Sequence, residues 1–305
     1  MSFEQKPPRS LQISMQQRIQ VLARRTGRST EHIKNILLME RLIARFNEFF
    51  PDTTILKGGL ALEFQLSSSR TTKDIDIRTT GSSDKLAQML KKVEEFRPEP
   101  EDHLHFKIEE DVKHPNITGV GVKYLGYRYQ VIVTMANNEY ARFGLDVSFQ
   151  DPIYGEPLIM KGDSFFEKYG IPAIEARIYP PPTHLAEKLH AYSCPLEEGR
   201  ENSRCKDIVD ILLLAELLDG VEAEQLYEAF ETTFRYRGTH DIPLRLSEPP
   251  ENWRAMYSKI KNENDLHWQD IDEIFQLVSS FMNPILAKQK GVWSYDDFEW
   301  KQTEQ

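Results

Sequence analysis

The sequence predicts an α+β fold in which N-terminal helices precede a mixed sheet and a helical C-terminal domain. Apolar residues recur at helical spacing before residue 50, β-rich runs occupy much of the middle, and helical periodicity returns after the prolines at 180–182. The length of 305 residues is enough for about two domains. We expect an N-terminal helical segment over 1–52, a core over 53–180 and a C-terminal helical domain over 181–305.

The expected helices and strands follow one another along the chain, with glycines and capping residues marking where some of them begin or end. Helices are expected over 11–25, ended by Gly27, and from Ser29 or Thr30 to about 50. The expected elements that follow are a strand at 53–56, a turn at 58–59, a helix at 60–66, a strand at 73–78, an amphipathic helix at 83–96, and β-rich runs at 104–109, 117–125, 127–135 and 143–149. Gly126 indicates a hairpin between the second and third of these runs, and every expected element beyond residue 182 is a helix, at 183–194, 203–218, 222–236, 251–262 and 267–282.

The composition is that of a water-soluble globular protein. Hydrophobic residues make up 40% of the chain, yet none of its apolar runs approaches the ~20 residues of a membrane span. The polar N-terminus does not resemble a signal peptide, and two cysteines cannot form a disulfide framework, so we expect a cytoplasmic protein with no membrane partner. The net charge is −10, but residues 1–50 carry nine Lys/Arg and four Asp/Glu, a net of +5. This basic segment is either a docking face for a polyanion or a solvated helix surface.

Two carboxylates on one strand are the centre of the functional prediction. Side chains alternate along a strand, so Asp74 and Asp76 project from one face while Ile75 and Ile77 enter the core. Such carboxylates lie roughly 7 Å apart and repel unless a cation separates them. Asp146, in another apolar strand, reaches the same face if the strands are neighbours. Three carboxylates placed in this way can hold two Mg²⁺ ions, or Mn²⁺, beside a triphosphate.

A glycine pair strengthens this interpretation, because Asp-X-Asp alone also occurs on solvated strands. Fourteen residues separate Lys57-Gly58-Gly59 from Asp74, in a strand–turn–helix context. Glycines allow backbone N–H groups to approach phosphate oxygens, and the N-terminus of the following helix favours negative charge. Lys57, Gly58 and Gly59 are therefore expected to bind the nucleotide. An ordinary tight turn is the alternative explanation.

The C-terminal helices add a lysine and two acids. Lys188 lies off the buried face of its helix, and Asp207 and Asp210 share one side of the next helix. Lys188 either braces the two helices through Asp210 or binds a β- or γ-phosphate with Asp210 positioning it. Arg204 and Lys206 are candidates for the same anionic pocket.

Five segments together resemble the AbiEii/AbiGii-type nucleotidyltransferase toxins. They are Met39–Phe46, Leu56–Leu62, Arg70–Asp76, Leu185–Ala191 and Arg204–Asp210, which follow the order and spacing of that family over about residues 10–217. Residues 78–145 match only as a pattern of strands, and residues 218–305 match no family feature.

The resemblance implies a polymerase-β-type nucleotidyltransferase fold and the toxin of a toxin–antitoxin or phage-defence system. It implies that Asp74 and Asp76 bind the metal, that Gly58, Gly59 and Thr72 lie at the nucleotide, that Lys188 helps hold the triphosphate, and that Asp210 is the acidic residue of the last motif. It also implies an NTP substrate, a cognate antitoxin and an RNA acceptor, the tRNA 3′ end. Gly59 departs from the wider superfamily, which usually has serine there, so the backbone alone must contact the phosphate.

The nature of the acceptor has competing interpretations. The acidic C-terminal region favours a cationic small molecule such as an aminoglycoside, or a protein hydroxyl, whereas the basic N-terminal segment favours RNA. A non-catalytic nucleotide-binding module is a third possibility, although the intact acidic pair argues against it. Candidates for base selectivity are Arg70, Thr72 and Tyr192.

Overall fold

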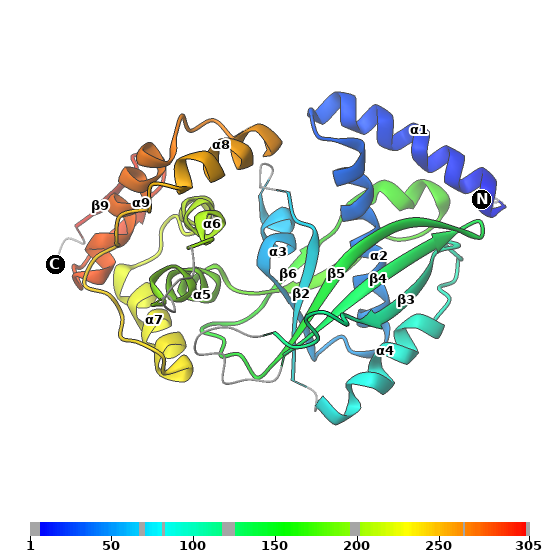
Figure 1. Ribbon diagram of the computed structural model, residues 1–305, viewed down its shortest axis with the longest axis horizontal. Coiled ribbons are helices and arrows are strands. Elements are labelled where there is room, and N and C mark those ends of the chain that lie inside the picture. Colours follow the sequence, from blue (N-terminus) through cyan, green and yellow to red (C-terminus); the bar gives the residue numbers. More distant parts are fainter. Residues whose placement is uncertain are drawn as a thin grey trace.

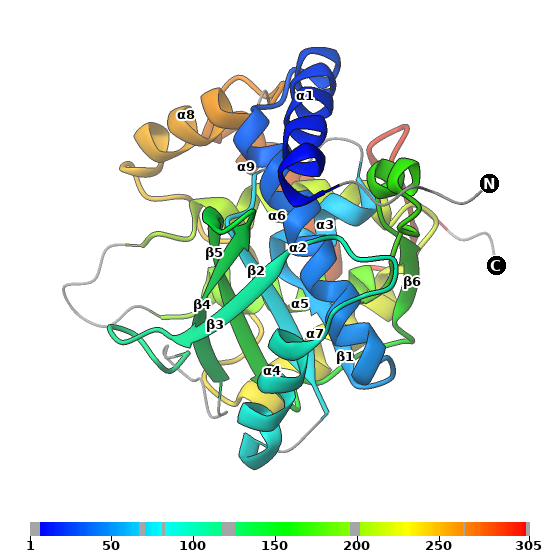
Figure 2. The same ribbon diagram turned by 90° about the vertical axis from the view of Figure 1, so that its right-hand side faces the viewer.

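The computed structural model describes residues 7–66, 71–80, 83–117, 126–195, 202–264 and 266–302. The described chain has two halves (Figure 1): a sheet with α1, α2 and α4, and a layer formed by α5 to α9. Figure 2 shows the sheet between α2 and α4 on the near side and α5 to α7 on the far side. None of the described helices combines the length and apolar character needed to cross a membrane.

The helices and strands agree with most of the sequence expectations. The helices are α1 (Pro8–Thr26), α2 (Thr30–Phe49), α3 (Gly58–Gln65), α4 (Leu86–Glu95), α5 (Pro181–Ser193), α6 (Cys205–Leu217), α7 (Ala223–Arg237), α8 (Trp253–Asn264) and α9 (Ile271–Leu286), with short 3₁₀ turns at Ser83–Lys85 and Ser164–Tyr169. The strands are β1 (Thr54–Lys57), β2 (Asp74–Thr79), β3 (His105–Glu110), β4 (Gly126–Met135), β5 (Asn138–Phe149), β6 (Leu158–Lys161), β7 (Glu175–Ile178), β8 (Val292–Ser294) and β9 (Glu299–Lys301).

The large sheet has the strand order β3-β4-β5-β2-β1-β7-β6. The short strand β2 is central, antiparallel to β1 and parallel to β5. Ile75 and Ile77 of β2 are completely buried, as are Leu145 and Val147 of β5. Both strands therefore direct their apolar residues to one face and leave their aspartates on the other.

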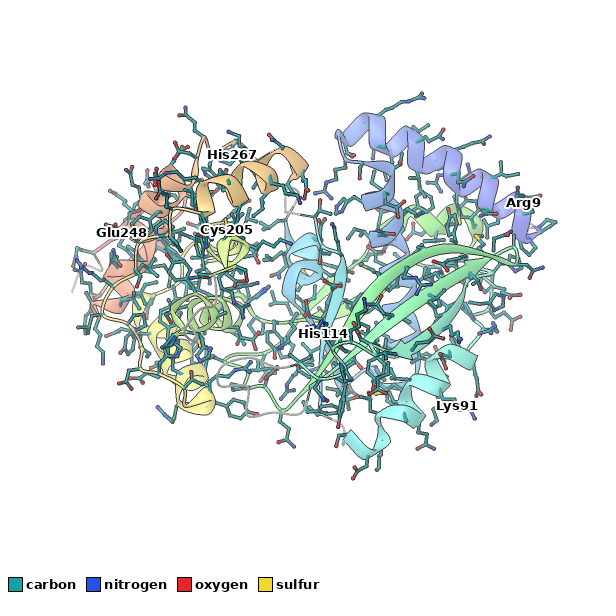
Figure 3. All side chains as sticks on the ribbon, in the orientation of Figure 1. Arg9, Lys91, His114, Cys205, Glu248 and His267 are labelled. Atoms are coloured by element: carbon teal, nitrogen blue, oxygen red, sulfur yellow. The ribbon has the colours of Figure 1, made fainter. Side chains whose placement is uncertain are left out.

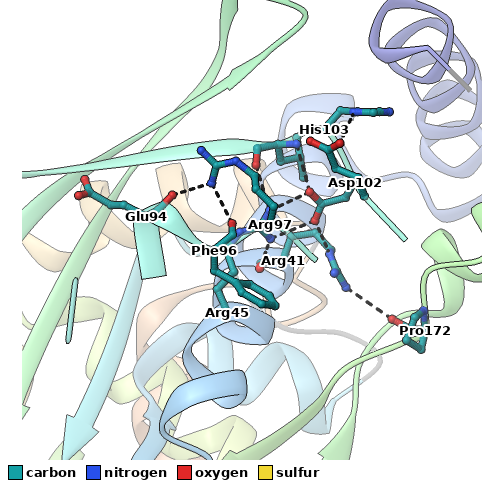
Figure 4. A network of polar contacts seen from close by, with 10 residues as sticks. Arg41, Arg45, Glu94, Phe96, Arg97, Asp102, His103 and Pro172 are labelled. Atoms are coloured by element: carbon teal, nitrogen blue, oxygen red, sulfur yellow. Dashed lines mark hydrogen bonds and ion pairs between the residues drawn. The ribbon is translucent and has the colours of Figure 1, made fainter. Parts of the chain in front are cut away.

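Helix α2 anchors the N-terminal helices to the sheet. Ser29 caps it by accepting a hydrogen bond from the backbone N–H of His32, and Gly27 ends α1 with φ of 74°. Two arginines of α2 lie in the interior, where Arg45 binds Asp102 with an Nη2–Oδ1 distance of 2.7 Å and Arg41 approaches it at 3.1 Å (Figure 4). Burial alone raises the pKa of Asp102, but the two guanidinium groups outweigh it and lower that pKa. Two of the nine basic residues before position 50 are therefore structural.

The apolar side chains form two cores. One core extends from Leu11 to Ile178 and joins the N-terminal helices to the sheet. The other joins α5 to α9 and includes Leu62 within α3 and Leu66 just beyond the end of α3. Cys205 is buried in α6 within this second core (Figure 3), and no disulfide joins it to Cys194. Helix α3, which follows the double glycine, thus lies where the two cores meet.

Some segments differ from the sequence expectations. The sheet gains β6 and β7, which are only four residues each and too short to show a periodic pattern. The region after residue 182 is not entirely helical, because β8 and β9 form a hairpin whose Trp293 and Trp300 pack against Phe281. The expected strand at 117–125 falls almost wholly on residues 118–125, outside the described residues.

Candidate active site

Four charged residues form a row across the middle of the sheet. In register, Lys57 of β1 lies opposite Asp76 of β2, Asp76 lies beside Asp146 of β5, and Asp146 lies opposite Arg128 of β4. In-register neighbours share one face of a sheet, so the row reads positive, negative, negative, positive. Asp74 lies two residues before Asp76 on the same face. The three aspartates predicted from the sequence therefore converge.

Two glycines provide the space for the acidic pair. A Cβ atom on Gly58 would lie 2.0 Å from Oδ2 of Asp76, and a Cβ on Gly144 would lie 2.2 Å from Oδ1 of Asp74. Gly58 also has φ of 66°, a left-handed conformation that glycine adopts without strain. Gly58 is thus required at this position by the carboxylate beside it as well as by the turn. Gly59 is buried in the first turn of α3.

Both carboxylates of the acidic pair, Asp74 and Asp76, have raised pKa values. Burial raises the pKa of Asp76 to about 6, the neighbouring Asp146 and Asp74 add to this rise, and Lys57 and Lys188 oppose it. Burial also raises the pKa of Asp74, with Asp146 acting in the same direction and Arg128 and Lys206 against it. Crowded carboxylates with raised pKa values are typical of a site that receives a cation.

Lysine 188 reaches this site from α5. Its Nζ lies 2.9 Å from Oδ1 of Asp207 and 2.7 Å from Oδ2 of Asp210, both on α6. Asp210 is completely buried, so the ion pair holds α5 and α6 together. The same lysine is close enough to Asp76 to lower its pKa. The structural brace and the position beside the carboxylates are therefore compatible.

The other predicted residues occupy varied positions. Thr72 is buried and donates its hydroxyl to the carbonyl oxygen of Asp74 at 3.1 Å, which fixes the start of β2. Arg204 is half-exposed at the start of α6 and lies 3.6 Å from Asp207. Tyr192 is buried and donates to the carbonyl of Ser247. Arg70 lies outside the described residues.

Lys57 belongs to a buried network that the sequence analysis missed. Its Nζ lies 2.6 Å from Asp151, just beyond β5, and 3.4 Å from Glu187 of α5. Arg237, at the end of α7, approaches the same two carboxylates at 3.1 and 3.3 Å. The network connects the strand before Gly58 to the helix that carries Lys188. No sequence motif marks Asp151 or Arg237, although Glu187 stands beside Lys188.

The donor set fits a divalent cation. Asp74 and Asp76 offer carboxylate oxygens on one face, which is the ligand type that Mg²⁺ prefers. Arg128 grips both oxygens of Asp146, with Nε–Oδ1 at 2.9 Å and Nη2–Oδ2 at 2.8 Å. Within the described ranges, no three His, Cys, Asp or Glu side chains are already arranged as a ligand set. Asp146, the candidate third ligand, thus forms an ion pair with Arg128 in this structure.

Comparisons with known proteins identify the family and the fold. A family model described as the nucleotidyl transferase AbiEii toxin of a type IV toxin–antitoxin system matches residues 41–277, which include every site residue above. No curated protein matches the chain. Among solved structures, the chain is similar to MenT4, a nucleotidyltransferase toxin from Mycobacterium tuberculosis, with 15% identity and a TM-score of 0.53 over 88% of this chain and 98% of that one. It also aligns with JHP933 from Helicobacter pylori, with 14% identity and a TM-score of 0.45 over 86% and 95% of the two chains. The expected α+β nucleotidyltransferase fold is confirmed.

Proposed function

Because the chain belongs to the AbiEii family of nucleotidyltransferase toxins, we propose that it transfers a nucleoside monophosphate from a Mg²⁺-bound NTP to RNA. The acceptor we propose is the 3′ end of a tRNA. The observation that carries the proposal is the convergence of Asp74, Asp76 and Asp146 on one face of the sheet, within electrostatic reach of Lys188.

Each residue has a distinct part in the proposed reaction. Asp74 and Asp76 hold the metal, which supplies charge neutralisation at the triphosphate and activation of the acceptor hydroxyl. Gly58 and Gly59 begin α3, whose N-terminal backbone N–H groups would bind phosphate oxygens. Lys188, oriented by Asp207 and Asp210, neutralises a β- or γ-phosphate. Asp146 is the third ligand or accepts the proton of the acceptor hydroxyl.

Transfer itself depends on positioning and charge. Phosphoryl-type transfers need little covalent participation from the protein, so the main task is to align the hydroxyl with the α-phosphate and to stabilise charge on the phosphate oxygens. The site contains the groups for both tasks. Its cationic residues come from both halves of the structure, because Arg128 lies on β4 of the sheet and Lys188 lies on α5.

An RNA acceptor is favoured by the outer face of the N-terminal helices. Helix α1 contains four arginines and no acidic residue, and Arg9, Arg24 and Arg25 are exposed. Arg18 is occupied instead, donating to the carbonyl of Phe165 and stacking 4.5 Å from its ring centroid. Exposed arginines on a helix that contains no acidic residue attract a phosphate backbone independently of sequence.

The test is a label-transfer assay with separated acceptors. The enzyme is incubated with each α-³²P-labelled NTP in turn, together with purified tRNA, total RNA, a protein lysate or an aminoglycoside. We expect label on tRNA, its loss with EDTA and its loss in Asp76→Asn. Label on protein or antibiotic instead of RNA would replace the proposed acceptor, and no label on any acceptor would contradict the proposed transfer.

A second variant separates RNA capture from chemistry. Arg24→Glu/Arg25→Glu reverses two exposed charges in the last turn of α1, outside the sheet that carries the acidic row. We expect weaker use of tRNA and a shallower dependence on salt, with unchanged NTP binding.

A type IV toxin also implies an antitoxin, and we propose that this chain is neutralised by a cognate partner in a toxin–antitoxin or phage-defence system.

A further inference from the structure

Asp74, Asp76 and Asp146 form an acidic trio, and the carboxylate of Asp146 is already in an ion pair with Arg128. Arg128 faces Asp146 in register across β4 and β5, and its guanidinium contacts both carboxylate oxygens at 2.9 and 2.8 Å. This side-on fork is the strongest geometry for an arginine–carboxylate pair. The fork uses one lone pair on each oxygen of Asp146 and places a positive charge beside a candidate metal ligand.

Arg128 differs in how it is held from Lys57 and Lys188, the two lysines that lower the pKa of Asp76. The side chains of Lys57 and Lys188 are each 14% exposed and lie between two carboxylates of the surrounding structure. The side chain of Arg128 is 38% exposed, more than twice as much. A flexible, solvent-accessible side chain can leave its partner at small cost, whereas a buried cation cannot. Arg128 is therefore the positive charge of the row that can move.

We propose that Arg128 is a built-in counter-ion that competes with the divalent metal for Asp146. Before substrate arrives, it balances the carboxylates that line the sheet, and it releases Asp146 when the metal–nucleotide enters. This proposal rests on the proposed function, because it takes Asp146 as part of the metal site. It makes Arg128 a positioning residue that sets the metal affinity of the empty enzyme.

If Arg128 competes with the metal, its removal should change metal affinity in the opposite direction to the removal of a metal ligand. Removing Arg128 should strengthen metal binding, because both oxygens of Asp146 are then available to the metal. Removing a ligand should weaken it. A purely structural cross-strand pair would affect stability slightly and leave metal affinity unchanged.

The test measures Mn²⁺ binding without nucleotide, by the electron paramagnetic resonance signal of unbound Mn²⁺. We expect Arg128→Ala to bind Mn²⁺ about fivefold more tightly than the wild type, which corresponds to the upper value for an exposed ion pair. The matched control is Arg142→Ala on β5, which removes a similar fork to Glu139 with distances of 3.3 and 3.0 Å. This control should leave Mn²⁺ affinity unchanged.

Two further variants identify the carboxylate responsible. The gain from Arg128→Ala should disappear when Asp146→Asn is already present. A gain that persists in this background would be simple charge repulsion and would overturn the proposal, as would an unchanged or weaker affinity in Arg128→Ala. If Asp74→Asn and Asp76→Asn bind Mn²⁺ like the wild type, the proposed metal site fails first, independently of the result for Arg128.

Discussion

Replacing Gly58 with alanine is expected to damage catalysis far more than stability. The added Cβ would lie 2.0 Å from Oδ2 of Asp76, and real Cβ contacts rarely fall below 3.0 Å, so the carboxylate must move by at least about 1 Å. A displacement of about 1 Å at a reacting centre costs on the order of 100-fold in rate. The left-handed backbone adds about 1–2 kcal/mol of strain for a residue other than glycine.

The control separates these two effects. Gly27 has φ of 74°, close to the 66° of Gly58, but its Cβ would meet no atom within 4 Å. Gly27→Ala should therefore show the same loss of unfolding free energy and full activity, whereas Gly58→Ala should lose about 100-fold in kcat/KM for NTP. Urea unfolding and steady-state label transfer measure the two quantities. Equal activity in both variants would refute the role assigned to the Gly58–Asp76 contact.

Three other substitutions test separate parts of the account. Gly144→Ala should displace Asp74 through a 2.2 Å contact and weaken Mn²⁺ binding by about tenfold or more, without any backbone strain; unchanged binding would contradict the placement of Asp74. Lys188→Met should destabilise the fold by about 3–5 kcal/mol by removing the partner of buried Asp210, and Lys188→Met/Asp210→Leu should recover stability but not activity. Recovered transfer in the double variant would make Lys188 a brace only. Burial raises the pKa of Glu40 from 4.5 to about 8, so its contribution to stability is complete below pH 4.5 and is lost as pH rises towards 8. Between pH 5 and pH 8 this loss amounts to about 3.5 kcal/mol, and Glu40→Gln should remove it, as measured by urea unfolding at the two pH values. Parallel pH profiles for the two proteins would contradict the raised pKa.

The parts of the site that the sequence predicted depend on local geometry. Alternation along a strand is enough to place Asp74 and Asp76 on one face, because side chains in any strand alternate. Helical periodicity similarly leaves Lys188 off the buried face of α5. These inferences need no knowledge of which elements are neighbours.

The remaining parts depend on long-range pairing. Asp146 joins the pair only because β5 lies parallel to β2 in a register that aligns it with Asp76. Gly144 and Arg128 acquire their roles from that same register, and neither has a local signal. Lys57 was predicted to bind the nucleotide, and its contacts with Asp151 and Glu187 come from strand ends and helices distant in sequence. Its role at the nucleotide stays a prediction.

The most direct test of the account is a crystal structure with Mn²⁺ and a non-hydrolysable NTP analogue, using anomalous scattering to locate the metal. We expect a peak within ligand distance of Asp74 and Asp76, with the triphosphate between them and Nζ of Lys188. We also expect Arg128 turned away from Asp146. A metal and nucleotide bound elsewhere, with the acidic row unchanged, would contradict the proposed active site.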